Sequence, residues 1–163
     1  MRYSEITETR PIVELISNWT DGYDASDVWT GGRLALDREV IATCAGLNHR
    51  VEGMLYRGQG IADELAETLK TGGSGRTEKT KTLLTSWTKS EEIARQFARV
   101  AHDNHGMSAA VIAVPASHLN VVVDVTQIPG ADHREQEVIC LHETIMLTPD
   151  NVRYVIVYDE DKG

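Results

Sequence analysis

The sequence predicts an α+β fold, with helices in the first part of the chain and mainly strands in the second. Early apolar residues recur at helical spacing, whereas the later apolar runs are short, rich in Val and Ile, and separated by turn residues. The chain has 163 residues, of which 41% are hydrophobic and 25% charged, so it can bury the core of one ordinary domain. We therefore expect a single domain over 1–163, divided into a helical lead-in (1–50) and a β core (51–163).

Two helices are expected in the lead-in. Pro11 suits the first turn of a helix, and the residues after it place an apolar stripe on one face, at Ile12, Leu15, Ile16 and Trp19. The glycine-containing stretch 21–32 predicts a loop. A second helix, over roughly 33–48, is indicated by the apolar residues Leu34, Val40, Ile41 and Leu47.

The β core is expected to begin with a strand that starts at Val51 and ends at Arg57-Gly58. A short amphipathic helix follows, with apolar side chains on one side at Ile61, Leu65 and Leu69. Residues 71–81 combine turn residues and charge without an apolar anchor, which predicts a mobile loop. A short strand from Leu83 to Trp87 comes next.

The helix after this strand has the clearest start signal in the chain. Thr88 and Ser90 can both cap it, and Glu91 completes a Thr-x-x-Glu capping box. Its buried stripe is expected at Ile93, Phe97, Val100 and Ala101. Strand-length apolar runs then follow at 109–114, 121–125, 137–141, 144–147 and 154–158.

Charge and cysteine content narrow the class of protein. A formal net charge of −9 disfavours a broad nucleic-acid-binding surface and adsorption to anionic membranes, because nucleic acids and such membranes are negatively charged and would repel the protein. Cys44 and Cys140 lie far apart, so we expect neither a disulfide framework nor a thiolate metal site. No apolar stretch approaches membrane length, and no secretory leader is recognisable. We therefore expect a cytoplasmic protein with no membrane partner.

Two carboxylates two residues apart, in Glu135-Gln136-Glu137, form the first candidate site. In a strand, Glu135 and Glu137 project to the same side while Gln136 faces away. Carboxylates that share one face repel each other, so the arrangement suits a site that receives a cation. Taken alone, the pair also fits a solvated strand edge.

Two further motifs stand at the predicted strand ends. Arg57 next to Gly58 offers a guanidinium fork beside backbone that a ligand can approach closely, which suits a pyrophosphate. Ser86-Trp87-Thr88 places two hydroxyls on one face, and either could hydrogen-bond a carboxylate and hold its rotamer. The plainer readings are a surface arginine and a helix cap.

In this order, Tyr56-Arg57-Gly58, Ser86-Trp87-Thr88 and Glu135-Gln136-Glu137 resemble the Arg-Ser-Glu class of ADP-ribosyltransferases, which includes bacterial toxins, phage transferases and vertebrate ecto-transferases. The Ala-x-x-Phe-Ala helix (Ala94 to Ala98) after the serine motif agrees, and the resemblance spans roughly 33–158. It implies a split two-sheet β core behind N-terminal helices. It also implies transfer of ADP-ribose from NAD+, in a toxin or a phage or bacterial effector.

The resemblance also implies a role for each motif residue. Glu137 would stabilise the positive charge that develops on the ribose, and Ser86 would orient it. Arg57 would hold the phosphates, the backbone of Gly58 would contact the nicotinamide amide, and Thr88 would complete the NAD+ site. NAD+ is expected as a substrate, without a metal.

The acceptor is inferred from Glu135. A second carboxylate can bind a guanidinium and take its proton, so Glu135 favours transfer to an arginine of a target protein. The loop Thr126 to Arg134 would be the recognition turn, and an antitoxin or inhibitor would be a further partner. Three alternatives stay open: an RNA or DNA acceptor, plain NAD+ hydrolysis, and a non-catalytic NAD+-binding or interaction module.

Other motif-like patterns do not meet the chemistry that they would need. The segment from Gly75 to Thr80 has Glu78, not glycine, before Lys79, so it is not expected to bind a nucleotide triphosphate. His142-Glu143 has no second histidine at position 146, and the scattered histidines predict no metal site.

Overall fold

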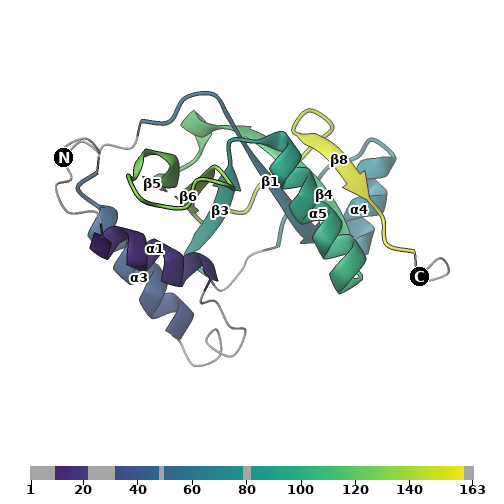
Figure 1. The fold of residues 1–163 in the computed structure, drawn as a ribbon. Helices are drawn as coiled ribbons and strands as arrows, with labels where there is room; N and C mark the ends of the chain where they lie inside the picture. Colours follow the sequence, from purple (N-terminus) through teal and green to yellow (C-terminus); the bar gives the residue numbers. More distant parts are fainter. Residues whose placement is uncertain (1–9, 22–31, 48–49, 79–81, 160–163) are drawn as a thin grey trace. The chain divides into compact units, whose positions relative to one another are not determined.

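The computed structural model describes residues 10–21, 32–47, 50–78 and 82–159 (Figure 1). The chain divides into two compact units, and each draws on separate segments of the sequence. The first unit comprises Met1–Gly53, Thr80–Ser86 and Ala116–His142, and the second comprises Met54–Lys79, Trp87–Pro115 and Glu143–Gly163. Each unit contains both helix and strand, which confirms the α+β prediction.

The described strands form a mostly antiparallel six-stranded sheet, in the order β5-β6-β3-β1-β4-β8, and a separate pair, β2-β7. The boundary between the units falls inside β3 (Leu84–Thr88), after Ser86. None of the helices in the described part of the chain is long and apolar enough to cross a membrane.

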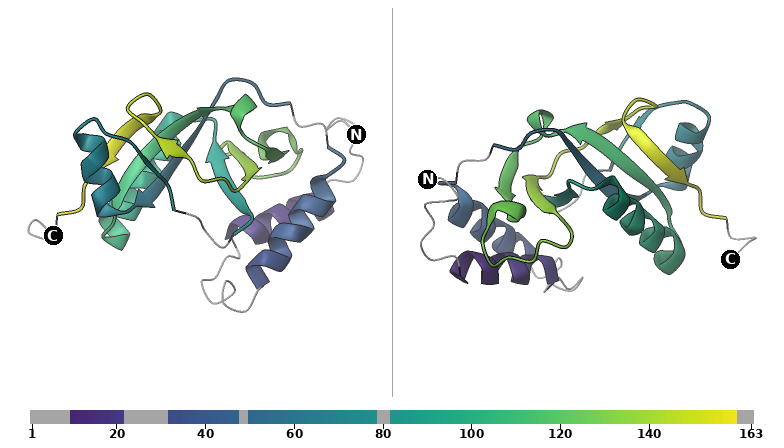
Figure 2. Two further views of the ribbon diagram at one scale, coloured as in Figure 1. Left: turned by 180° about the vertical axis from the view of Figure 1, so that it is seen from behind. Right: turned by 45° about the horizontal axis from the view of Figure 1, so that its top comes forward.

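The first unit contains two α-helices, the first part of β3 and two further strands. Its elements are α1 (Arg10–Asp21), α3 (Gly32–Cys44), η2 (Ala116–His118), β5 (Val121–Asp124), η3 (Val125–Gln127) and β6 (Glu137–Leu141). β5 and β6 run antiparallel, with Val123 opposite Ile139 and Asp124 opposite Val138. Helices α1 and α3 lie side by side in both views of Figure 2.

The core of this unit confirms both predicted N-terminal helices. The predicted stripe of α1 is buried in full, at Ile12, Leu15, Ile16 and Trp19. These residues pack with buried residues of α3, the segment after it and the sheet: Val40, Cys44, Leu47, Leu84, Val123 and Ile139. The predicted loop 21–32 lies outside the described residues except at its two ends.

A buried carboxylate links α1, α3 and the segment that leads into β3. Asp37, on α3, is 0% exposed. Its Oδ1 accepts a 2.7 Å hydrogen bond from the indole Nε1 of Trp19, and its Oδ2 accepts a 2.8 Å bond from the backbone N–H of Leu83. Because both carboxylate oxygens are satisfied, the burial of Asp37 is compatible with stability.

The second unit contains the longest strands. Its elements are β1 (Met54–Ile61), α4 (Asp63–Lys70), β2 (Gly75–Arg76), the end of β3, α5 (Glu91–His105), β4 (Ser108–Pro115), β7 (Met146–Leu147) and β8 (Val152–Ile156). β1 pairs along its whole length with β4, so that Arg57 lies opposite Ile112 and Gly58 opposite Val111.

Two sequence predictions are corrected in this unit. β1 does not run from Val51 to Arg57-Gly58 but from Met54 to Ile61, because its backbone is paired with β4 from Pro115 to Ser108. The segment 71–81 is not wholly a loop, since Gly75–Arg76 forms β2 and pairs with β7. Its last residues, 79–81, lie outside the described part of the chain.

The buried face of α5 also differs from the prediction. Ala94 and Ala98 are fully buried, whereas Phe97 is 41% and Val100 44% exposed. The cause is Gly58 of β1: a Cβ built there would lie 1.8 Å from the carbonyl oxygen of Ala94. A backbone approach this close leaves room only for alanine on the helix face that meets the strand.

Ser90, one of the two residues predicted to cap α5, is the residue that caps it. Its hydroxyl accepts a 3.3 Å hydrogen bond from the backbone N–H of Ile93. Thr88, the other candidate, is the last residue of β3, and its hydroxyl accepts a 3.1 Å bond from the N–H of Ser90. Where the strand ends and the helix begins, Thr88 therefore binds the backbone N–H of Ser90, and Ser90 binds that of Ile93.

Candidate active site

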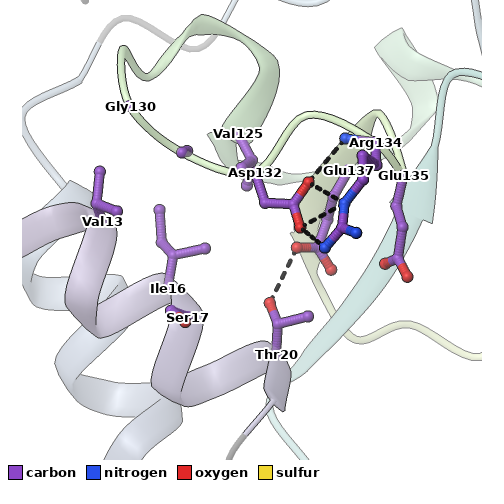
Figure 3. A pocket seen from close by; sticks show the side chains of 11 residues that line it. Val13, Ile16, Ser17, Thr20, Val125, Gly130, Asp132, Arg134, Glu135 and Glu137 are labelled. Atoms are coloured by element: carbon purple, nitrogen blue, oxygen red, sulfur yellow. Dashed lines mark hydrogen bonds and ion pairs between the residues drawn. The ribbon is translucent and has the colours of Figure 1, made fainter.

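Glu137 is a buried carboxylate at the first position of β6 and is 6% exposed. Its Oε2 accepts a 2.5 Å hydrogen bond from Oγ of Ser86. Its Oε1 accepts a 3.0 Å bond from Oγ1 of Thr20, which Figure 3 shows. Hydrogen bonds to both oxygens fix the orientation of the carboxylate. Such a group can stabilise a nearby cation or accept a hydrogen bond from a ligand hydroxyl.

Ser86 owes its position to β3. Its neighbours Thr85 and Trp87 are buried, while Ser86 itself is half-buried and contacts Glu137, which lies on the adjacent strand, β6. The structure thus brings Ser86 and Glu137, two predicted site residues, into direct contact.

Glu135 is placed differently from the prediction. Strand β6 begins at Glu137, and Gln136 has a φ of 48°, in the left-handed region. The backbone N–H of Gln136 donates to the carbonyl oxygen of His133 at 3.1 Å, which closes a turn before the strand. The prediction that strand alternation puts Glu135 and Glu137 on one face is therefore wrong. A left-handed residue between them breaks the two-residue period.

A cavity of about 300 Å³ nevertheless includes both glutamates. Its walls come from one face of α1 and from the segment that follows β5, and Figure 3 shows these two sides. The lining residues are Val13, Ile16, Ser17, Thr20, Val125, Gly130, Ala131, Asp132, Arg134, Glu135 and Glu137. The cavity therefore combines an apolar wall with carboxylates and hydroxyls.

The loop on the cavity rim is shaped by its own side chains. Buried Asp124 accepts hydrogen bonds from the backbone N–H of Thr126 at 3.0 Å and from Nε2 of Gln127 at 2.8 Å. Further along, Arg134 Nη2 donates to Asp132 Oδ2 at 2.6 Å. Hydrogen bonds from Arg134 lower the pKa of the Asp132 carboxyl to about 2. This ion pair is solvent-exposed, so it orders the loop locally and adds little to stability.

The remaining predicted residues lie in the second unit. Arg57 Nε donates a 2.8 Å hydrogen bond to Oε1 of Gln59, two residues along β1 and on the same face. A Cβ at Gly58 would point to the opposite face of β1, where α5 packs. Thr88 is 3% exposed, and its hydroxyl accepts the hydrogen bond from the backbone N–H of Ser90 described above.

Sequence reasoning missed Thr20 as a site residue. The signal was present, because Thr20 lies four residues after the buried Ile16 and so shares its helix face. A hydroxyl at that position on an otherwise apolar stripe has to find a hydrogen-bond partner. What the sequence could not give was the partner, which lies 117 residues away.

No group of three or more His, Cys, Asp or Glu residues in the described ranges is arranged to hold a metal ion. Comparison with known proteins gives no match to a family model, to a curated protein or to a solved structure.

Proposed function

We propose that this chain is a mono-ADP-ribosyltransferase of the Arg-Ser-Glu class, which transfers ADP-ribose from NAD+ to an arginine of a target protein. The observation that supports this best is the 2.5 Å hydrogen bond from Ser86 to Glu137. It joins two of the three motifs of the class across 51 residues of sequence. The α+β class of the chain is the fold class that this proposal requires.

In this proposal Glu137 acts on the ribose of NAD+. Cleavage of the nicotinamide–ribose bond leaves its electron pair with nicotinamide and builds positive charge on the sugar, as in glycoside hydrolysis. A carboxylate that is already oriented stabilises this charge without having to reorganise. The burial of Glu137 and its two hydroxyl donors supply that preorganisation.

Arg57 would hold the pyrophosphate of NAD+. A guanidinium is always charged and presents its donors in a rigid plane, which matches phosphate oxygens. The hydrogen bond from Nε to Gln59 restrains that plane. In the proposal, the backbone of Gly58 contacts the nicotinamide amide and Thr88 lies next to the bound dinucleotide.

Glu135 would receive the acceptor. It is exposed and lines the same cavity as Glu137, so an entering guanidinium would meet carboxylates on one side and apolar α1 residues on the other. The Glu135 carboxylate would orient the guanidinium and accept its proton as the new C–N bond forms to the ribose. Water in place of the acceptor would give plain hydrolysis.

Labelled NAD+ and a target lysate test the proposal. We expect the wild-type protein to label macromolecules and Glu137→Gln not to label them. Glu135→Gln should lose transfer but still release free ADP-ribose. Glu67→Gln, at an exposed position of α4, is the matched control and should behave as wild type.

Digestion of the product identifies the acceptor. Label that disappears with protease and survives nuclease supports the arginine acceptor. Label removed only by nuclease would replace it with RNA or DNA. Equal labelling by wild type and Glu137→Gln would contradict the catalytic assignment itself.

A further inference from the structure

We propose that Thr20 is a positioning residue for Glu137, and that α1 is thereby part of the catalytic apparatus. The inference rests on the proposed function, in which the Glu137 carboxylate stabilises the ribosyl cation. Thr20 donates from α1 to Oε1, while Ser86 donates from β3 to Oε2, at 3.0 and 2.5 Å. Each carboxylate oxygen therefore has its own hydroxyl donor, from a different element.

Two donors restrain a carboxylate more than one donor does. The terminal torsion of a glutamate side chain is broad, so a single hydrogen bond leaves the carboxylate plane free to turn about the bonded oxygen. A second donor on the other oxygen removes that rotation. Since preorganised groups stabilise a developing charge best, loss of either donor should slow the reaction.

Thr20 is itself held firmly in place. The residue before it, Trp19, is 4% exposed and donates its indole N–H to Asp37 Oδ1 at 2.7 Å. One turn earlier, Ile16 is buried in the same core. The Thr20 hydroxyl therefore belongs to a helix that is held in position by the buried side chains of Ile16 and Trp19.

Asp37 connects the two elements that supply the donors. Its Oδ1 binds Trp19 of α1, and its Oδ2 accepts the N–H of Leu83, three residues before Ser86. One buried carboxylate thus anchors both α1 and the segment entering β3. The N-terminal helices are then more than a lead-in to the β core, because α1 donates to the Glu137 oxygen that is not bound by Ser86.

The test is steady-state nicotinamide release from NAD+ by purified protein. Thr20→Val keeps the branched shape and removes the donor, whereas Thr20→Ser keeps the donor. We expect Thr20→Val to lower kcat roughly tenfold to a hundredfold, with the KM for NAD+ within about twofold of wild type. Thr20→Ser should recover most of the rate. Asn18→Ala, exposed on the same helix, is the matched control.

Thermal unfolding and a double-mutant cycle separate positioning from a loss of structure. All variants should unfold within a few degrees of wild type, and Thr20→Ala replaces Thr20→Val if the latter does not fold. In a Glu137→Gln background, Thr20→Val should have no further effect, because it acts through that carboxylate.

Each outcome bears on a distinct claim. Wild-type kcat in Thr20→Val, or an equal loss in Thr20→Val and Thr20→Ser, would overturn the inference while the proposed function stands. A wild-type protein that releases no nicotinamide would overturn the proposed function and the role of Thr20 with it.

Discussion

Ser86 Oγ donates a 2.5 Å hydrogen bond to Oε2 of Glu137, and this contact joins β3 to the start of β6. If Ser86 orients the carboxylate, Ser86→Ala should reduce nicotinamide release about tenfold to a hundredfold and leave the fold intact. Ser117→Ala, at an exposed position of η2, is the control. Steady-state kinetics on both variants check this, and an unchanged rate in Ser86→Ala would show that the contact has no catalytic role.

Gly58 permits the close approach of α5 to β1. Because an added Cβ would lie 1.8 Å from the Ala94 carbonyl oxygen, Gly58→Ala should lower the free energy of unfolding by about 3 kcal/mol or more. Gly46→Ala is the matched control, because a Cβ there meets nothing within 4 Å. Urea denaturation measures both. Equal stability of Gly58→Ala and wild type would mean that strand and helix are not packed this closely.

Asp37 should be a major determinant of stability in the first unit. Both of its oxygens accept N–H donors, so Asp37→Asn would turn its amide donors toward one of them and leave a buried donor unsatisfied. We expect a loss of about 2–3 kcal/mol in chemical denaturation. Asp150→Asn, which is exposed, should differ from wild type by less than about 0.5 kcal/mol. A stability of Asp37→Asn equal to that of the control would contradict the anchoring role.

The buried thiol of Cys44 should make the free energy of unfolding depend on pH. Burial raises the pKa of its thiol from 9.0 to about 11, so the unfolded chain ionises this group first as pH rises. The contribution of the neutral thiol is fully present below pH 9.0 and is lost progressively up to about pH 11. The stability difference between wild type and Cys44→Ala should fall by roughly 2–3 kcal/mol over this range. A difference that does not change with pH would show that the thiol is accessible to water.

The sequence predicts correctly those structural features that depend on residues close together in the chain. The stripe of α1 follows a 3.6-residue period and is buried as predicted, and Ser90 caps α5 as its position suggests. The short apolar runs from 109 onward correspond to strands because β-branched residues and turn residues alternate there. These features depend on neighbours within a few residues in the chain.

Prediction failed where a distant partner decides the outcome. Phe97 and Val100 have the composition of a buried stripe, but a glycine in β1 brings the backbone so close that alanines occupy the interface. Likewise, the left-handed Gln136 separates Glu135 from the strand, although the sequence Glu-x-Glu alternates as a strand would. The contact of Thr20 with Glu137 depends on how α1 docks, which no local pattern encodes.

The central claim is that Glu137 is the carboxylate that acts on NAD+. Its most direct test is nicotinamide release by purified wild-type protein and Glu137→Gln, which keeps the size of the side chain and removes its charge. The account predicts measurable release by the wild type, and a rate about a hundredfold to a thousandfold lower in Glu137→Gln with unchanged thermal stability. Equal rates in the two proteins, or no release by the wild type, would contradict it.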